Sequence, residues 1–325
     1  MVRGTFFSLG DDKYFLGTVG LINSLQVTGH TGEIVILDCG FAPDQRQLLA
    51  TTCTLVQPPD DYSGHFSMDL KLVAPRTHQS DVTIMIDSDI IVTGPLDDVI
   101  ASAENGNIVA YADPESDRWF AEWEQIFELP CAPRHAAYVC AGFVAFSQRH
   151  HPELLDHWLA ACKHLPKTST TGAVHAAVAQ SDQDALNAVL MSKYPQGTVD
   201  LRQAPEAPQA HELRVGVAVH DVRTLRCSYD GQDTLMLHSA GRPKPWIRLG
   251  ARKNAYTTLL TRLLASDDAA ISVPRSAIPS WLRDGRPSAA YLTALNAYGD
   301  LRRLISRRIQ YVPTNVRAKV SRLLP

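Results

Sequence analysis

The sequence predicts an α/β domain built around a mainly parallel central sheet. Short apolar segments rich in β-branched residues alternate with segments whose apolar residues recur at helical spacing, which is typical of βαβ units. One segment, Val82–Ile86, has the composition of a strand buried on both faces. Polar turns follow the first and the fourth expected strands. Because such sheets bind ligands beyond the carboxyl ends of their strands, the chemistry is expected at those turns.

The first half of the chain supplies four of the expected strands. Thr5–Leu9 is apolar and ends at the polar turn Gly10–Lys13, after which apolar residues keep helical spacing from Tyr14 to Leu25. Gly29 closes that helix. The other strands expected in this half are Glu33–Leu37, Thr54–Gln57 and Val82–Ile86, and the other helices are Pro43–Ala50 and Met68–Ala74.

The second half continues the pattern less regularly. Its expected strands are Ile108–Ala112, Val139–Phe146 and Thr234–Leu237, and its expected helices are Pro152–Cys162 and Asp182–Tyr194. Gln196–Gln209 is rich in Pro, Ala and Gln and is expected to be an exposed connection. Beyond Trp246 the pattern is helical to the end.

Composition places the chain among ordinary globular proteins, with 325 residues, 45% hydrophobic and 20% charged. A net charge of −3 argues against a nucleic-acid binder. The charge is unevenly distributed, because residues 298–325 hold seven Lys and Arg against one aspartate. This tail alternates apolar and basic positions like a helix that lies on an anionic membrane surface. A helix packed on the rest of the protein, with its arginines solvated, remains the alternative.

Six scattered cysteines without a C-x-x-C pair indicate free thiols and a reducing compartment rather than a disulfide framework. The residues after Met1 are too soon interrupted by Asp11 and Asp12 for a signal peptide, and no apolar run reaches the roughly 18 residues of a membrane span. The expected location is the cytoplasm, with possible peripheral attachment to the inner face of the membrane.

Asp87-Ser88-Asp89 directly follows Val82–Ile86. Two carboxylates separated by one residue at the mouth of a buried sheet can hold a divalent cation, which in turn can grip a diphosphate. The alternative is a polar strand end that faces water. The apolar residues Ile90-Ile91-Val92, which follow Asp89, favour a cation site. Carboxylates between two apolar segments are energetically costly unless another group pairs with them.

A second motif runs from Leu237 to Trp246, with sequence L-H-S-A-G-R-P-K-P-W. His238 offers a nitrogen ligand, Gly241 lets backbone approach a phosphate, and Lys244 can neutralise charge on a leaving diphosphate. The alternative is a proline-stiffened turn with Trp246 packed in the core. A third motif, Ser181–Leu186, contains Asp182 and Gln183, and also has the S-x-x-D spacing of a helix capping box.

These motifs, together with the turn Asp11-Asp12-Lys13-Tyr14, occur in an order that resembles the family 8 retaining glycosyltransferases. The resemblance covers roughly residues 5–248. It implies a GT-A type nucleotide-sugar-binding domain over residues 1–248, followed by a helical C-terminal extension over residues 249–325.

The resemblance also implies roles for individual residues. Asp87, Asp89 and His238 resemble the family's metal ligands, and Gly241 and Lys244 resemble the residues that touch the donor diphosphate.

On the nucleotide and sugar side, Asp11 and Tyr14 resemble the nucleotide-contacting turn, with Tyr14 a candidate to stack on uracil. Asp113 stands where the family has a carboxylate that holds the donor sugar. Asp182 and Gln183 resemble the family residues that line the reacting face of that sugar.

Three positions depart from the family pattern. Asp69 stands where an arginine is usual, and Lys71 is a candidate to cover part of that role. Cys140 replaces an asparagine near the sugar, and Lys13 replaces a frequent asparagine in the nucleotide turn. These departures bear on the donor more than on the reaction.

The function implied is transfer of a sugar from a UDP-sugar to a glycan, glycolipid or small-molecule acceptor, with retention at the anomeric carbon. The nitrogen ligand favours Mn²⁺ over Mg²⁺. Two alternatives are a sugar-nucleotide binder that has lost turnover and a haloacid-dehalogenase-type phosphatase with an aspartate nucleophile. Acceptor selection is expected in Glu115–Arg134 and Gln196–Asp221, where the aromatics Trp119, Phe120 and Trp123 either stack on sugars or pack on the core.

Overall fold

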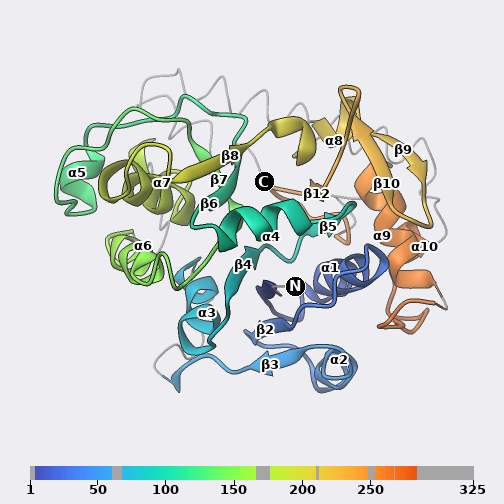
Figure 1. The fold of residues 1–325 in the computed structure, drawn as a ribbon. Coiled ribbons are helices and arrows are strands. Elements are labelled where there is room, and N and C mark those ends of the chain that lie inside the picture. Colours follow the sequence, from blue (N-terminus) through green and yellow to red (C-terminus); the bar gives the residue numbers. More distant parts are fainter. Residues whose placement is uncertain are drawn as a thin grey trace, which may run out of the picture.

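The computed structural model describes residues 4–60, 68–165, 176–209, 212–247, 253–266 and 268–283. Its centre is a seven-stranded sheet in the order β3-β2-β1-β4-β7-β6-β8 (Figure 1). All neighbouring strands are parallel except where β7 pairs with β4 and with β6. The strands are β1 (Gly4–Gly10), β2 (Ile34–Asp38), β3 (Thr54–Val56), β4 (Val82–Ile86), β6 (Ile108–Ala112), β7 (Val139–Phe146) and β8 (Val199–Arg202). The predicted α/β class with a mainly parallel sheet is confirmed.

Apolar residues of the strands alternate between the two faces of the sheet, as a period of two requires. Phe6 and Ile84 lie in one apolar cluster with the side chains of helices α1, α4 and α9. Their neighbours Phe7 and Met85 face the opposite side, where η2 and α3 cover the β1–β2 part and α6 and α7 cover the β6–β7 part (Figure 1). Both faces are therefore buried, which explains why Val82–Ile86 is rich in apolar and β-branched residues.

The helices have the following bounds: α1 (Phe15–Val27), α2 (Pro43–Leu49), η2 (Met68–Leu72), α3 (Val73–Thr77), α4 (Asp97–Glu104), α5 (Trp123–Ile126), α6 (Leu154–Cys162), η3 (Ala176–Val178), α7 (Asp182–Lys193), η4 (Ala204–Glu206), α8 (Glu212–Val215), α9 (Ala255–Ala265) and α10 (Ser280–Arg283). The helix predicted over Met68–Ala74 divides into a 3₁₀ turn and a short α-helix. Its Lys71 lies in the 3₁₀ turn and points to the carboxyl edge of the sheet, as shown below.

Two smaller sheets complete the fold. β5 (Ile90–Val92) pairs antiparallel with β12 (Met236–His238), and the register places His238 opposite Ile90. This pairing brings the end of β12, the last strand among the described residues, beside the Asp87–Asp89 turn. A three-stranded antiparallel sheet of β9 (Ala218–Asp221), β10 (Arg226–Tyr229) and β11 (Gln232–Asp233) lies at the periphery (Figure 1).

The prediction that Gln196–Gln209 is an exposed connection is wrong. Residues 199–202 form β8, which extends the main sheet parallel to β6, and Gln209 is only 6% exposed. An edge strand is covered less completely than a central one, and all four residues of β8 are only half-buried. Its sequence V-D-L-R therefore lacks the apolar run that marks the central strands.

Helix α9 packs on α1 and belongs to the same apolar cluster. Asn23 of α1 donates to the carbonyls of Leu263 and Ile271 and accepts from the Ile271 amide. The division of the chain at residue 248 stays a prediction, and the basic tail lies outside the described residues. Among the helices that are described, none has the length and apolar character to cross a membrane.

Candidate metal centre and active site

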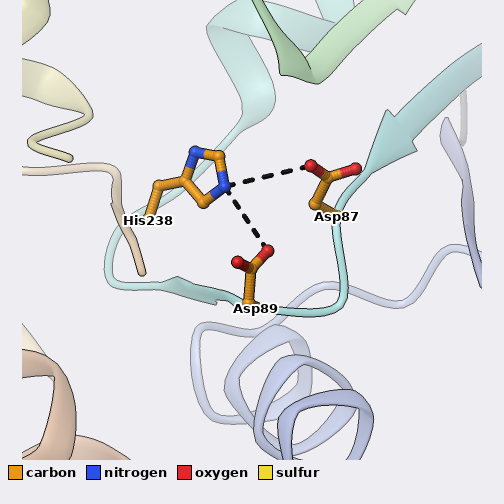
Figure 2. Close-up of side chains that lie close together, drawn as sticks. All are labelled: Asp87, Asp89 and His238. Carbon is orange, nitrogen blue, oxygen red and sulfur yellow. Dashed lines mark ion pairs between the residues drawn. The ribbon is translucent and has the colours of Figure 1, made fainter. Parts of the chain in front are cut away.

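Three side chains from separate segments converge at the carboxyl edge of the sheet. Asp87 follows β4, Asp89 precedes β5 and His238 ends β12, and their ligand atoms lie within 4.8 Å of one another. The His238 Nε2 atom is 3.4 Å from Asp89 Oδ1 and 3.9 Å from Asp87 Oδ2 (Figure 2). The structure thus brings together the three residues that the resemblance assigns to a metal.

Backbone contacts fix this arrangement. The Asp87 amide donates to the Gly142 carbonyl at 2.8 Å, and the Ser239 amide donates to the Asp89 carbonyl at 3.0 Å. Gly142 must be a glycine, because a Cβ atom there would lie 2.5 Å from His238 Cε1 and 3.2 Å from Asp87 Oδ2. This requirement for glycine at position 142 could not be predicted from the sequence, since it comes from a histidine 96 residues later.

A lysine lies near each of the two carboxylates. Lys244 forms an ion pair with Asp89, and Lys71 Nζ lies 3.8 Å from Asp87 Oδ1. Burial raises the pKa of Asp89, but His238 and Lys244 outweigh it and hold that pKa well below its usual range. For Asp87, burial is the largest influence and its pKa is raised despite Lys71. Burial lowers the pKa of His238, and the Asp89 carboxylate reverses the direction and raises it well above the ordinary value.

The donor set fits a divalent cation. Two carboxylates and one imidazole nitrogen are ligands that Mn²⁺ and related ions accept. Even without a cation, these carboxylates lie close to the positively charged Lys244 and Lys71. Lys244 contacts Asp89 Oδ2, whereas His238 faces Asp89 Oδ1, so a cation bound at Oδ1 would share this carboxylate with the ammonium group and be repelled by its charge.

A second set of polar side chains lies beside Asp87, Asp89 and His238, and two of its members are hydrogen-bonded to the backbone of β7. Gln183, in the first turn of α7, accepts from the Ala141 amide at 2.9 Å and donates to Asp113 Oδ2 at 3.0 Å. Lys71 pairs with Asp182 and donates to the Ala141 carbonyl at 3.0 Å. The predicted sugar-side residues Asp113, Asp182 and Gln183 are therefore adjacent, with Lys71 between them and the metal group.

The first turn of α7 is held by an unexpected contact. Ser181 caps the helix with no side-chain hydrogen bond and has a positive φ of 53°, so the capping-box expectation is wrong. Asp184 instead accepts from the Gln180 amide at 2.7 Å, from the Tyr138 hydroxyl at 2.8 Å and from the Arg118 guanidinium. Arg118 thereby ties the segment after β6 to the turn that carries Asp182 and Gln183.

The nucleotide turn and the second motif meet. Asp11 Oδ1 accepts from the amides of Lys13 and Tyr14, each at 3.0 Å. The Tyr14 ring lies edge-on to Trp246 at 5.8 Å and the same distance from Lys244 Nζ, and the Trp246 indole donates to the Lys13 carbonyl. Trp246 is buried, which confirms the core position considered for it. This position is compatible with that of His238 beside Asp87 and Asp89.

The structure gives the local surroundings of Gly241, Trp123 and Trp119, while contact of Gly241 with a diphosphate stays a prediction. Gly241 has a φ of +84° and open space around its missing Cβ, so the turn needs glycine for its backbone conformation. Trp123 is fully buried and packs in the core rather than presenting a sugar-binding face. Trp119 is half-buried and contacts the His135 ring at a tilt of 31°, with ring centroids 5.3 Å apart.

No protein-family model matches the sequence, and no curated protein matches it. Solved structures do. An active-site mutant of LgtC with glutamine replaced by glutamate is 15% identical, with a TM-score of 0.55, and the galactosyltransferase LgtC in complex with donor and acceptor sugar analogues is 16% identical, with a TM-score of 0.56. Each match covers 84% of this chain and 98% of LgtC. The bifunctional glycosyltransferase WbbM matches at 16% identity and a TM-score of 0.52, over 82% of this chain and 50% of WbbM. The chain therefore has the GT-A fold of these glycosyltransferases.

Proposed function

We propose that this protein is a metal-dependent retaining glycosyltransferase that uses a UDP-sugar donor. The observation that carries the proposal is the group Asp87, Asp89 and His238 with Lys244 beside it, at the carboxyl edge of a GT-A sheet. The similarity to the structure of LgtC with donor and acceptor sugar analogues supports a sugar-transfer role for this chain.

Each side chain has a place in the proposed reaction. Asp87, Asp89 and His238 hold the cation, for which Mn²⁺ is favoured over Mg²⁺ because of the nitrogen ligand. When bound, the cation stabilises negative charge on the diphosphate. Lys244 moves from Asp89 to the same oxygens, and Tyr14 with Asp11 receives the nucleotide.

The transfer step is a front-face displacement. The acceptor hydroxyl oxygen forms the new bond to the anomeric carbon on the face from which the diphosphate oxygen departs, and the acceptor proton passes to that departing phosphate. The contacts of Gln183 and Asp182 argue against a covalent intermediate on either side chain. The Gln183 amide oxygen already accepts from the Ala141 amide, and the Asp182 carboxylate is paired with Lys71.

The acceptor is proposed to be a glycan or a lipid-linked molecule, and the basic tail over residues 298–325 is proposed to bring the enzyme to an anionic membrane surface. Co-sedimentation with anionic vesicles at low salt tests the tail. We expect the full chain to pellet and the chain ending at residue 297 to stay in solution. Equal pelleting of the two, or no pelleting of either, would remove the membrane from the proposal.

A panel of nucleotide sugars tests the proposed reaction. The purified protein is incubated with each donor and Mn²⁺, with and without EDTA, and release of UDP is measured with water as the acceptor. We expect slow, metal-dependent hydrolysis of one UDP-sugar. Donor binding without any hydrolysis would favour a protein that only binds sugar nucleotides, and phosphate release from simple phosphoesters would favour a phosphatase.

A further inference from the structure

Two buried side chains lie behind His238, on the side of its ring that faces away from the carboxylates. Cys140 Sγ is 3.7 Å from His238 Nδ1 and also 3.7 Å from Gln209 Oε1. The three residues are 5%, 7% and 6% exposed, respectively for Cys140, His238 and Gln209. Water therefore has little access to Nδ1, and its hydrogen-bond partner is this thiol.

The chemistry of the three groups fixes the direction of the hydrogen bonds. An amide oxygen only accepts, so the contact with Gln209 Oε1 uses the thiol proton. The sulfur then has only lone pairs to offer His238, and Nδ1 must carry the ring proton. In the neutral ring this leaves the Nε2 lone pair directed at Asp87 and Asp89, 3.9 and 3.4 Å away.

The backbone holds each member in place. Gln209 forms a parallel bridge with His238, whose amide donates to the Pro208 carbonyl at 3.1 Å. The backbone amide of Gln209 donates to Glu212 Oε2, 3.0 Å away. Cys140 lies in β7, and the Gly142 amide donates to its sulfur at 3.4 Å. The hydrogen-bonded chain therefore connects three segments that are distant in sequence.

We propose that Cys140 and Gln209 are positioning residues for the metal ligand His238. Metal-bound histidines generally donate their second ring N–H to a partner that sets the tautomer and the ring orientation. Here the partner is a thiol, which is itself oriented by an amide. The inference rests on the proposed metal site and adds to it two residues that do not touch the cation.

Manganese affinity without nucleotide or acceptor tests the inference in the full chain. Free Mn²⁺ is followed by electron paramagnetic resonance during a titration. Loss of such a partner typically weakens metal binding by about 10- to 100-fold, and we expect this for Cys140→Ala and for Gln209→Leu. Cys140→Ser should restore binding to within a few-fold of wild type, because a hydroxyl both accepts and donates. Cys227→Ala is the matched control, because it removes a buried thiol in a different strand, β10, and it should bind Mn²⁺ as wild type does.

Nitrogen NMR of the labelled His238 ring provides a readout that a purely structural role would not change. At a pH where the His238 ring is neutral, the Nδ1 atom of the wild-type protein should carry the proton, and Cys140→Ala should show a mixture of tautomers. If Cys140→Ala and Gln209→Leu bind Mn²⁺ like wild type while His238→Ala does not bind, the positioning role is wrong and the metal site stands. If His238→Ala binds as tightly as wild type, the proposed metal site fails and the inference fails with it.

Discussion

Two halves of the candidate site are built differently. In the metal half the contacts join charged side chains to one another, with one further hydrogen bond from Lys244 to the Ser239 carbonyl. In the sugar half Lys71 and Asp182 also form an ion pair, but Lys71 and Gln183 are both hydrogen-bonded to the backbone of Ala141 in β7. The metal half consists of Asp87, Asp89, His238 and Lys244, and the sugar half consists of Lys71, Asp113, Asp182 and Gln183. Charges that pair with one another can exchange partners when a cation or a diphosphate arrives. Side chains that are hydrogen-bonded to the β7 backbone cannot exchange partners without breaking those bonds. We therefore expect the sugar half to be preorganised and to keep its arrangement when ligands bind, and the metal half to rearrange.

The largest effect is expected from breaking the metal half. His238→Ala should lower turnover by about 10³-fold, because a bound metal contributes several kcal/mol of charge stabilisation. Release of UDP in the presence of Mn²⁺ measures the loss, and circular dichroism checks that the fold is kept. His220→Ala changes an exposed histidine of β9 and should leave turnover unchanged. If EDTA-treated wild-type enzyme turns over as well as the Mn²⁺-loaded enzyme, the metal half has been misassigned.

Lys244→Met should separate two roles of the same ammonium group. We expect kcat to fall by about 10²-fold, the scale for losing one electrostatic group aimed at the developing charge. Manganese binding without nucleotide should instead become tighter, because the ammonium no longer occupies Asp89. Steady-state kinetics and a Mn²⁺ titration measure the two effects, with the exposed Lys253→Met as control. An effect confined to KM would mean that Lys244 binds ground state and transition state equally.

The sequence predicted the central strands well, and it singled out Asp87, Asp89 and His238, which the structure brings together, because both have local signatures. Val82–Ile86, Ile108–Ala112 and Val139–Phe146 have the bounds that were predicted, since each is a buried run between polar turns. Asp87 and Asp89 are marked by the strand before them. His238 is marked by the glycine, lysine and proline that follow it.

What the sequence did not reveal depends on contacts between distant segments. The half-buried β8 lacks a long apolar run, and Gln209 sits in a stretch whose composition is that of a loop. Its role becomes visible only when the parallel bridge places it beside His238. Arg118 and Asp184 are likewise ordinary charged residues in sequence, and their pairing joins segments 66 residues apart.

A smaller effect, of a different kind, is expected in the sugar half. Gln183→Leu leaves the buried Ala141 amide without its acceptor, which should cost about 1–3 kcal/mol of unfolding free energy. Urea unfolding should show this loss equally with and without Mn²⁺, in contrast to Lys244→Met, whose effect depends on the cation. Gln125→Leu changes an exposed position of α5 and controls for the substitution itself. A loss that disappears when Mn²⁺ is added would contradict a preorganised sugar half.

The smallest effect concerns a hydroxyl group at the border of the metal half. Tyr256 of α9 is fully buried, and its hydroxyl has no hydrogen-bond partner among the described residues. Burial and then the carboxylate of Asp89 raise its pKa well above the ordinary value. A rearrangement that removes Lys244 from Asp89 would change the surroundings of this hydroxyl. Helix α9 would then take part in the response to ligands although it lies beyond residue 248.

Tyr256→Phe tests how far that rearrangement extends. Without ligands the variant should match wild type in unfolding free energy or exceed it, because replacing an unpaired buried polar group with an apolar one of the same shape is close to neutral or stabilising. With Mn²⁺ and UDP its melting temperature should rise less than that of wild type. Tyr111→Phe is the matched control, since the Tyr111 hydroxyl is also buried with no hydrogen-bond partner in the described part of the chain, and its charged neighbours lie outside the metal half. Equal rises for wild type and Tyr256→Phe would show that the exchange of charges stops at Lys244 and leaves α9 undisturbed.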